Sequence, residues 1–445
     1  MVTDIIKNTN TDLLKLHYFD IDPRTIYQFH LLVGENIKQQ CVPSNPDHNL
    51  ISSHCYADSP TKLITLGFLI SKLWEKTFII YWILSLIINI NSDKFLIKIF
   101  TNTFDPSMLQ GSEELNLLES RVQIVELPNF EASVPNAERY MAFSNIIKNN
   151  SVKILIDLDG YAQRKIQNAN EHLLPTFLYC PSPIQITWLG YPNTTGLQEI
   201  KYKLTDEYVD PPQSPQFYTE TLIRLRYNWI FFPPHLIYPQ FSPISELPFH
   251  KNNTITFGVF NKPSKWSLKS KKLWSKILIR IPQSKLIIKF SKLSFTPSLK
   301  KAFIAFMEAQ GISPNRIHII KSPNDYTSYL NLYRSIDIQL DTIPYSGYST
   351  TANSLYMGVP VFTIAGTTHV QNRSSTLLYK SGLSECVGTC EESIINKISQ
   401  FIGKGGEYMQ NIRERLQQDS YQGKGIFNGK AQAREFEQLF EKLLN

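Results

Sequence analysis

The sequence predicts an α/β protein built on two open, mainly parallel sheets. Two observations support this. Short runs rich in Ile, Val and Leu alternate with helix-like segments, and the alternation stops in a proline-rich stretch and then restarts. Buried parallel strands have this composition, and strand–helix–strand repeats build open α/β sheets. At 445 residues the chain also exceeds the size at which a single core stops growing.

The first half of the chain opens with polar residues of weak helical periodicity, so residues 1–60 are expected to form a helical lead-in and a loop. Strands are then expected at 63–70, 95–101, 122–127 and 152–158. The most apolar run, 78–90, is shorter than the roughly 20 residues that span a bilayer. We therefore expect a buried core helix there rather than a membrane span.

The second half begins after several prolines crowded into 232–250, which favour a stiff connector. The expected domains are thus 1–60, 61–240 and 241–445. Strands are predicted at 254–260, 285–290, 316–320, 335–340 and 359–364, with a helix at 267–280. Apolar residues at helical spacing predict a closing helix at 431–444 in the second domain.

Composition narrows the range of partners. The formal net charge is +7, but the basic residues are scattered, which favours anionic small molecules over nucleic acid. The five cysteines form no CxxC pair, as expected for reduced thiols, and the first residues do not read as a signal peptide. We expect a cytoplasmic protein.

Three segments stand out chemically. In residues 340–366, a strand ends at Leu340 and a helix begins with Ser349, Thr350 and Thr351. Such hydroxyl residues either cap the helix or bind phosphate at its positive end. The other two segments, 185–197 and 256–286, contain turns after expected strands, formed by Leu189, Gly190, Tyr191 and Pro192 and by Asn261 with Lys265. By themselves these read as an ordinary turn and a solvated lysine.

Together the three segments resemble the O-GlcNAc transferase and SPINDLY glycosyltransferase family over roughly residues 60–445, without the helical repeats of many relatives. The resemblance implies a GT-B fold, with two Rossmann-like domains facing a central cleft. It also implies an inverting, metal-independent transfer to a protein Ser or Thr hydroxyl. The donor would be a nucleotide sugar, UDP-GlcNAc favoured or GDP-fucose as in SPINDLY, with no further cofactor.

The resemblance also assigns roles to residues. Ser349, Thr350 and Thr351 would hold the diphosphate and Lys265 would contact the donor phosphates. The 189–192 turn would lie against the donor sugar, and Asn261, Tyr329 and Asn353 complete the expected donor site.

Three positions depart from the family pattern. Lys76 stands where relatives carry a histidine near the acceptor, Tyr329 replaces a histidine near the base, and Asn353 replaces an acidic residue near the ribose. These departures leave open a binding protein without turnover, and another GT-B chemistry such as epimerisation also remains an alternative. The pair Asp157 and Asp159 spells a metal-binding DxD, but it falls where the family has a structural turn, so no metal is expected.

Overall fold

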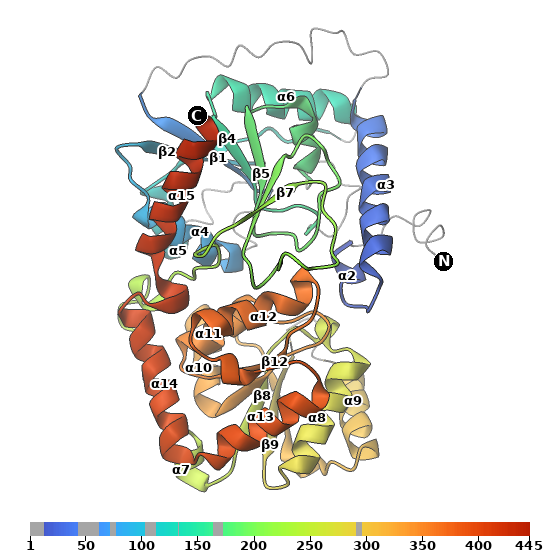
Figure 1. Cartoon of the computed structure of the whole chain (residues 1–445), viewed down its shortest axis with the longest axis vertical. Helices are drawn as coiled ribbons and strands as arrows, with labels where there is room; N and C mark the ends of the chain where they lie inside the picture. Colours follow the sequence, from blue (N-terminus) through green and yellow to red (C-terminus); the bar gives the residue numbers. More distant parts are fainter. Residues whose placement is uncertain are drawn as a thin grey trace. The chain divides into compact units, whose positions relative to one another are not determined.

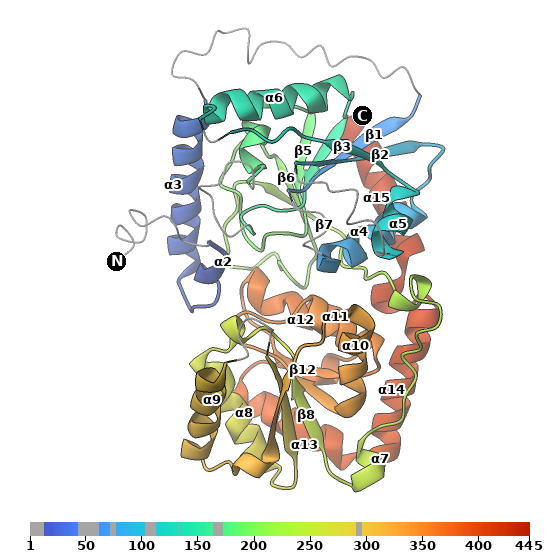
Figure 2. The same ribbon diagram turned by 180° about the vertical axis from the view of Figure 1, so that it is seen from behind.

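The computed structural model describes residues 13–42, 62–71, 77–102, 113–131, 133–162, 172–290 and 296–445. The chain divides into two compact units. The first comprises Met1–Leu16, Ile21–Phe232 and Asn428–Asn445, and the second comprises His17–Asp20 and Pro233–Phe427. The main division thus falls at the start of the proline-rich stretch. Each unit is a parallel sheet with helices packed on both faces (Figures 1 and 2).

The first unit contains a seven-stranded sheet in the order β3-β2-β1-β4-β5-β6-β7, with all neighbouring strands parallel. The strands are β1 (Ile64–Leu69), β2 (Phe95–Thr101), β3 (Gln123–Glu126), β4 (Ile154–Asp157), β5 (Ile184–Thr187), β6 (Tyr202–Thr205) and β7 (Thr221–Arg224). The chain builds outward from β1 in one direction and returns to extend the sheet in the other from β4, so the strand order reverses between β1 and β4. The four strands predicted for this half are confirmed.

The helices of this unit are α2 (Leu13–Leu16), α3 (Pro23–Cys41), α4 (Thr77–Asn89), α5 (Glu113–Glu119), α6 (Asn136–Asn149) and α15 (Gly429–Leu444). Helix α4 carries the most apolar run of the sequence, and its side chains from Ile79 to Ile87 are buried. The expectation of a core helix is therefore confirmed. Within the described ranges, every helix is too short or too polar to cross a membrane.

The closing helix α15 packs on the first unit and not, as the sequence suggested, on the second. Phe436 and Phe440 are fully buried, and the ring of Phe436 lies 5.0 Å from that of Trp188. The backbone N–H of Asn91 donates to the Glu437 carboxylate at 2.8 Å. Because α15 lies beside α4 (Figure 1), its apolar face completes the core of the first sheet.

The second unit contains a six-stranded parallel sheet in the order β10-β9-β8-β11-β12-β13. Its strands are β8 (Thr256–Val259), β9 (Lys285–Phe290), β10 (Ile317–Lys321), β11 (Ile338–Leu340), β12 (Val361–Ile364) and β13 (Val387–Gly388). Its helices are α7 (Phe249–Asn252), α8 (Leu268–Arg280), α9 (Pro297–Ala309), α10 (Tyr326–Asn331), α11 (Ser349–Tyr356), α12 (His369–Lys380), α13 (Glu391–Gly403) and α14 (Gly406–Tyr421). All five strands predicted for this half are present.

The strand order of the second sheet reverses between β8 and β11. In an open α/β sheet, ligands bind outside the carboxyl ends of the strands at this reversal. The topology therefore predicts a ligand site among the residues that follow β8 and β11.

Candidate functional site

Asp341 is the centre of a hydrogen-bonded group at this edge of the second sheet. It follows β11 directly and is 5% exposed. Its Oδ1 accepts from Asn261 Nδ2 at 3.0 Å and from the Gly347 N–H at 2.8 Å, and its Oδ2 accepts from Thr363 Oγ1 at 2.7 Å. One carboxylate thus ties together the ends of β8, β11 and β12 and the loop that leads to α11.

Sequence reasoning did not select Asp341, although it stands directly after a predicted strand inside a segment already singled out. It did select Asn261, and the structure brings the two residues together. The buried Asn261 Oδ1 has no hydrogen-bond partner among the described residues. An acceptor left free beside a loop is a candidate contact for a bound hydroxyl or N–H group.

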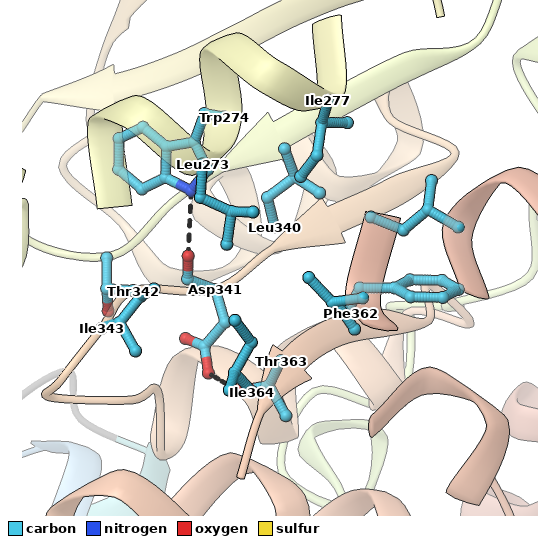
Figure 3. Close-up of a pocket in the computed structure, with 12 residues that line it drawn as sticks. Leu273, Trp274, Ile277, Leu340, Asp341, Thr342, Ile343, Phe362, Thr363 and Ile364 are labelled. Carbon is cyan, nitrogen blue, oxygen red and sulfur yellow. Dashed lines mark hydrogen bonds between the residues drawn. The ribbon is translucent and has the colours of Figure 1, made fainter. Parts of the chain in front are cut away.

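Asp341 also borders a small, largely apolar cavity (Figure 3). Trp274 Nε1 on α8 donates to the Asp341 backbone oxygen at 3.0 Å. The other lining residues are mostly aliphatic or aromatic side chains of β11, β12 and the neighbouring helices. This cavity belongs to the core beside the site, because most of its lining is apolar and the polar side chains Asp341 and Thr363 are already bonded to each other.

Lys265 lies against the same loop and is half-buried, not fully solvated. Its Nζ donates to the Ser346 carbonyl at 3.0 Å and lies 4.1 Å from the centre of the Tyr345 ring. Burial holds the pKa of Lys265 well below its usual value, and the nearby Arg373 lowers it further, whereas Asp341 acts in the opposite direction. An anion that approaches this lysine would stabilise its charged form.

Helix α11 begins at Ser349, as predicted, and its N-cap residue is Tyr348. The side chain of Tyr348 makes no capping hydrogen bond in the described structure. The first backbone bond of the helix runs from the Ala352 N–H to the Tyr348 carbonyl at 2.9 Å. Since Ser349 and Thr350 are already helical, neither occupies the N-cap position. Their half-buried side chains lie on the first turn, at the positive end of the helix dipole.

The remaining α11 candidates are engaged within the protein. Thr351 is buried, and its Oγ1 lies 2.8 Å from Ser374 Oγ. Asn353 is also buried, and its Oδ1 accepts from the Tyr326 hydroxyl at 2.6 Å. Thr351 therefore supports the loop from beneath, whereas Asn353 joins α11 to the tyrosines of α10.

Tyr329 belongs to a tyrosine cluster beside α11. Its hydroxyl lies 2.8 Å from the Tyr333 hydroxyl, and Tyr333 donates to the Thr350 carbonyl at 3.1 Å. Lys289, near the carboxyl end of β9, lies 5.0 Å from the Tyr329 ring centre. Burial, assisted by Lys262, lowers the pKa of Lys289 to about 8. The sequence analysis selected Tyr329 but not Lys289, because nothing in the sequence distinguishes Lys289 from the other lysines of the chain.

The turn formed by Leu189, Gly190, Tyr191 and Pro192 belongs to the first unit. Leu189 has a φ of 64°, and a Cβ on Gly190 would lie 2.0 Å from the Leu158 carbonyl oxygen, so only glycine fits there. Burial lowers the pKa of His30 to about 4, which keeps it neutral. Its Nδ1 lies 2.7 Å from the Ile26 carbonyl and therefore donates to it, and its Nε2 then accepts from the Tyr191 hydroxyl at 2.6 Å.

Asp157 and Asp159 also belong to the first unit and form a structural turn. Asp157 accepts from the Gly160 N–H at 2.9 Å and from Thr187 Oγ1 at 2.8 Å, and Asp159 accepts from the Ser71 N–H at 2.7 Å. In the part of the chain that the structure describes, no group of three or more His, Cys, Asp or Glu side chains is placed to hold a metal ion. Lys76 lies outside the described residues.

The chain is similar to known proteins both in sequence and in fold. The profile of glycosyl transferase family 41 matches residues 129–237 and 246–436. The probable UDP-N-acetylglucosamine–peptide N-acetylglucosaminyltransferase SPINDLY of Oryza sativa subsp. japonica is 36% identical over 57% of this chain and 26% of its own length. The protein of the same name from Arabidopsis thaliana is 33% identical over 64% of this chain and 30% of its own length. The chain thus spans less than a third of the curated relatives it matches.

Among solved structures, a mutant of the Thermobaculum terrenum O-GlcNAc transferase has a TM-score of 0.78 and 24% identity, over 96% of this chain and 75% of that chain. A glycosyltransferase from Rickettsia africae has a TM-score of 0.54 and 13% identity, over 86% of this chain and 100% of that chain. These likenesses confirm the GT-B fold. Because the sequence match runs through more than half of the chain and includes the candidate site around Asp341, the chain belongs to glycosyl transferase family 41.

Proposed function

We propose that this chain is an inverting, metal-independent glycosyltransferase that moves GlcNAc from UDP-GlcNAc to a Ser or Thr hydroxyl of a protein. The observation that carries the proposal is the edge of the second sheet. There, a half-buried lysine and the start of a helix without a side-chain cap meet beside one loop. The names of the matched relatives supply the donor and the peptide acceptor.

In the proposed reaction, the acceptor oxygen attacks the anomeric carbon as the bond to the nucleoside diphosphate breaks. The bonding electron pair leaves with the diphosphate, and the hydroxyl proton passes to a phosphate oxygen or to water. Lys265 and the first turn of α11 would stabilise the negative charge that develops on the leaving group, which is the step that an active site must favour.

The resemblance to SPINDLY implies a second candidate donor, GDP-fucose. The residues at the expected nucleoside position, a tyrosine and an asparagine, are compatible with either nucleotide. Both Tyr329 and Asn353 can contact a base or a ribose without fixing which nucleotide binds. A binding protein without turnover is the other alternative, since Lys76 replaces the histidine of relatives.

The test combines binding and transfer on the full chain. Thermal unfolding is followed with UDP, UDP-GlcNAc, GDP and GDP-fucose. A true ligand at 100 times its Kd should stabilise the protein by about 2.7 kcal/mol. Transfer is then measured by mass spectrometry on a pool of Ser- and Thr-containing peptides, once without and once with EDTA.

Lys265→Ala is the test variant, and Lys285→Ala is the matched control. Lys285 is exposed at the amino end of β9, the opposite edge of the sheet from Lys265. Transfer that depends on Lys265 but not on Lys285 supports the proposal. Stabilisation by a nucleotide sugar without any transfer would identify a binding protein, and loss of transfer in EDTA would refute the metal-independent mechanism.

A further inference from the structure

Arg373 is a buried cation next to the site, and sequence reasoning did not identify it. It lies in α12, which follows β12, the strand beside β11. Its side chain is 6% exposed, and its Nε has no hydrogen-bond partner among the described residues. Its Nη1 donates to the Tyr345 hydroxyl at 3.0 Å, and its Cζ lies 4.2 Å from the centre of the Tyr348 ring.

A second cation lies on the same aromatic loop. Lys265 Nζ is 4.1 Å from the Tyr345 ring centre, and Arg373 Cζ is 5.9 Å from that same point. The two charges are therefore no farther apart than the sum of these two distances. Within the described ranges, neither side chain forms an ion pair with a carboxylate.

This arrangement is costly in a protein that holds no anion. Buried charges are ordinarily paired, and two like charges within this distance repel each other where water is scarce. The repulsion is visible at Lys265, whose pKa is lowered first by burial and next by Arg373. Asp341 is the nearby acid, but its two carboxylate oxygens already accept three hydrogen bonds from other groups.

A purely structural role would not explain why a charged residue stands at position 373. Packing against two tyrosine rings requires only an extended side chain, which an uncharged residue such as methionine also provides. A buried guanidinium with an unsatisfied N–H adds desolvation cost without adding to that packing. The surplus positive charge is accounted for if the usual occupant of the site is a multiply charged anion.

We propose that Arg373 is a positioning residue of the diphosphate site. It holds the loop from Tyr345 to Tyr348 that leads into α11, and it adds its charge to that of Lys265 where the diphosphate binds. The inference rests on the proposed function, since it assumes that a nucleoside diphosphate is the ligand. It assigns to Arg373 a preference for diphosphates over monophosphates and nucleosides.

The test measures the Kd of UDP, UMP and uridine, and of GDP, GMP and guanosine, by calorimetry on the full chain. In Arg373→Met, we expect the affinity for the diphosphate that the wild type binds to fall about tenfold or more, as for loss of a charged partner. The monophosphate should lose less, and the nucleoside should change within about twofold. Arg373→Lys keeps the charge and should recover most of the affinity.

Arg280→Met is the matched control, because Arg280 is exposed at the end of α8. It should bind like the wild type. Equal losses for diphosphate and nucleoside, or an Arg373→Lys variant as weak as Arg373→Met, would show a structural role and overturn the inference. If the wild type binds UDP or GDP and Arg373→Met binds it equally well, the inference fails while the proposed function stands. A wild type that binds neither diphosphate overturns both.

Discussion

Replacing Asp341 by asparagine tests whether one carboxylate organises the candidate site. The aspartate accepts three hydrogen bonds at 2.7–3.0 Å and is almost fully buried. Asparagine has nearly the same shape but offers only one acceptor oxygen and no charge. If that oxygen keeps the bonds from Asn261 and Gly347, the new NH₂ group faces the Thr363 hydroxyl.

The expected cost follows from the bonds that change. A hydrogen bond to a charged group contributes about 1.5–3 kcal/mol, against about 0.5–1.5 kcal/mol for a neutral one. Two bonds that lose their charge and one that must be rearranged amount to roughly 2–3 kcal/mol. For a domain of 150–250 residues, each kcal/mol shifts the midpoint by about 2–4 °C, so the second unit of Asp341→Asn should melt roughly 4–12 °C lower.

Differential scanning calorimetry of the full chain measures this shift. Asp325→Asn is the matched control, because Asp325 caps α10 on the exposed surface and asparagine caps a helix equally well. The control should melt close to the wild type. An Asp341→Asn protein that melts with the wild type, or a control that falls by the same amount, would refute the central role of Asp341.

Four further predictions concern the ligand. Lys265→Ala should weaken UDP or GDP binding about tenfold to a hundredfold in calorimetry, because a charged donor is lost, and should leave the free nucleoside unaffected; equal diphosphate affinity would contradict it. Ser349→Val with Thr350→Val should cost about 1–3 kcal/mol of diphosphate binding with unchanged circular dichroism, and normal binding would show that the hydroxyls are not ligands. A bound diphosphate should raise the lowered pKa of Lys265. The affinity for the diphosphate should therefore be greatest at a pH where Lys265 is already protonated in the free protein, and it should fall as pH rises through the pKa that Lys265 has in the complex. The slope is read above about pH 7, where the phosphate is fully ionised, and should vanish in Lys265→Met. Lys76→Met should retain transfer within about a hundredfold, the lower end of general-base contributions, whereas Lys76→His should increase transfer if the missing imidazole limits it.

Local pattern in the sequence was enough to predict most of the strands. The nine strands expected from apolar runs are present, and β11 ends at Leu340 and α11 begins at Ser349 as predicted. These features are encoded by neighbours in sequence, because side-chain periodicity and turn residues act over a few positions. The strands β6, β7 and β13 were not predicted, because their residues do not form runs of Ile, Val and Leu like those that marked the other strands.

Only the tertiary structure decided which residues form the site. Asn261 and Asp341 are far apart in sequence, and they meet because β8 and β11 are neighbours in one parallel sheet. The same applies to α15, whose apolar face was evident but whose partner was not, since amphipathicity says that a helix is buried and not against what. The sequence by itself therefore determined nine of the strands, the start of α11 and the family resemblance. The charge balance around Lys265 depended on packing between distant segments, because burial and the approach of like charges exist only once the sheet has formed.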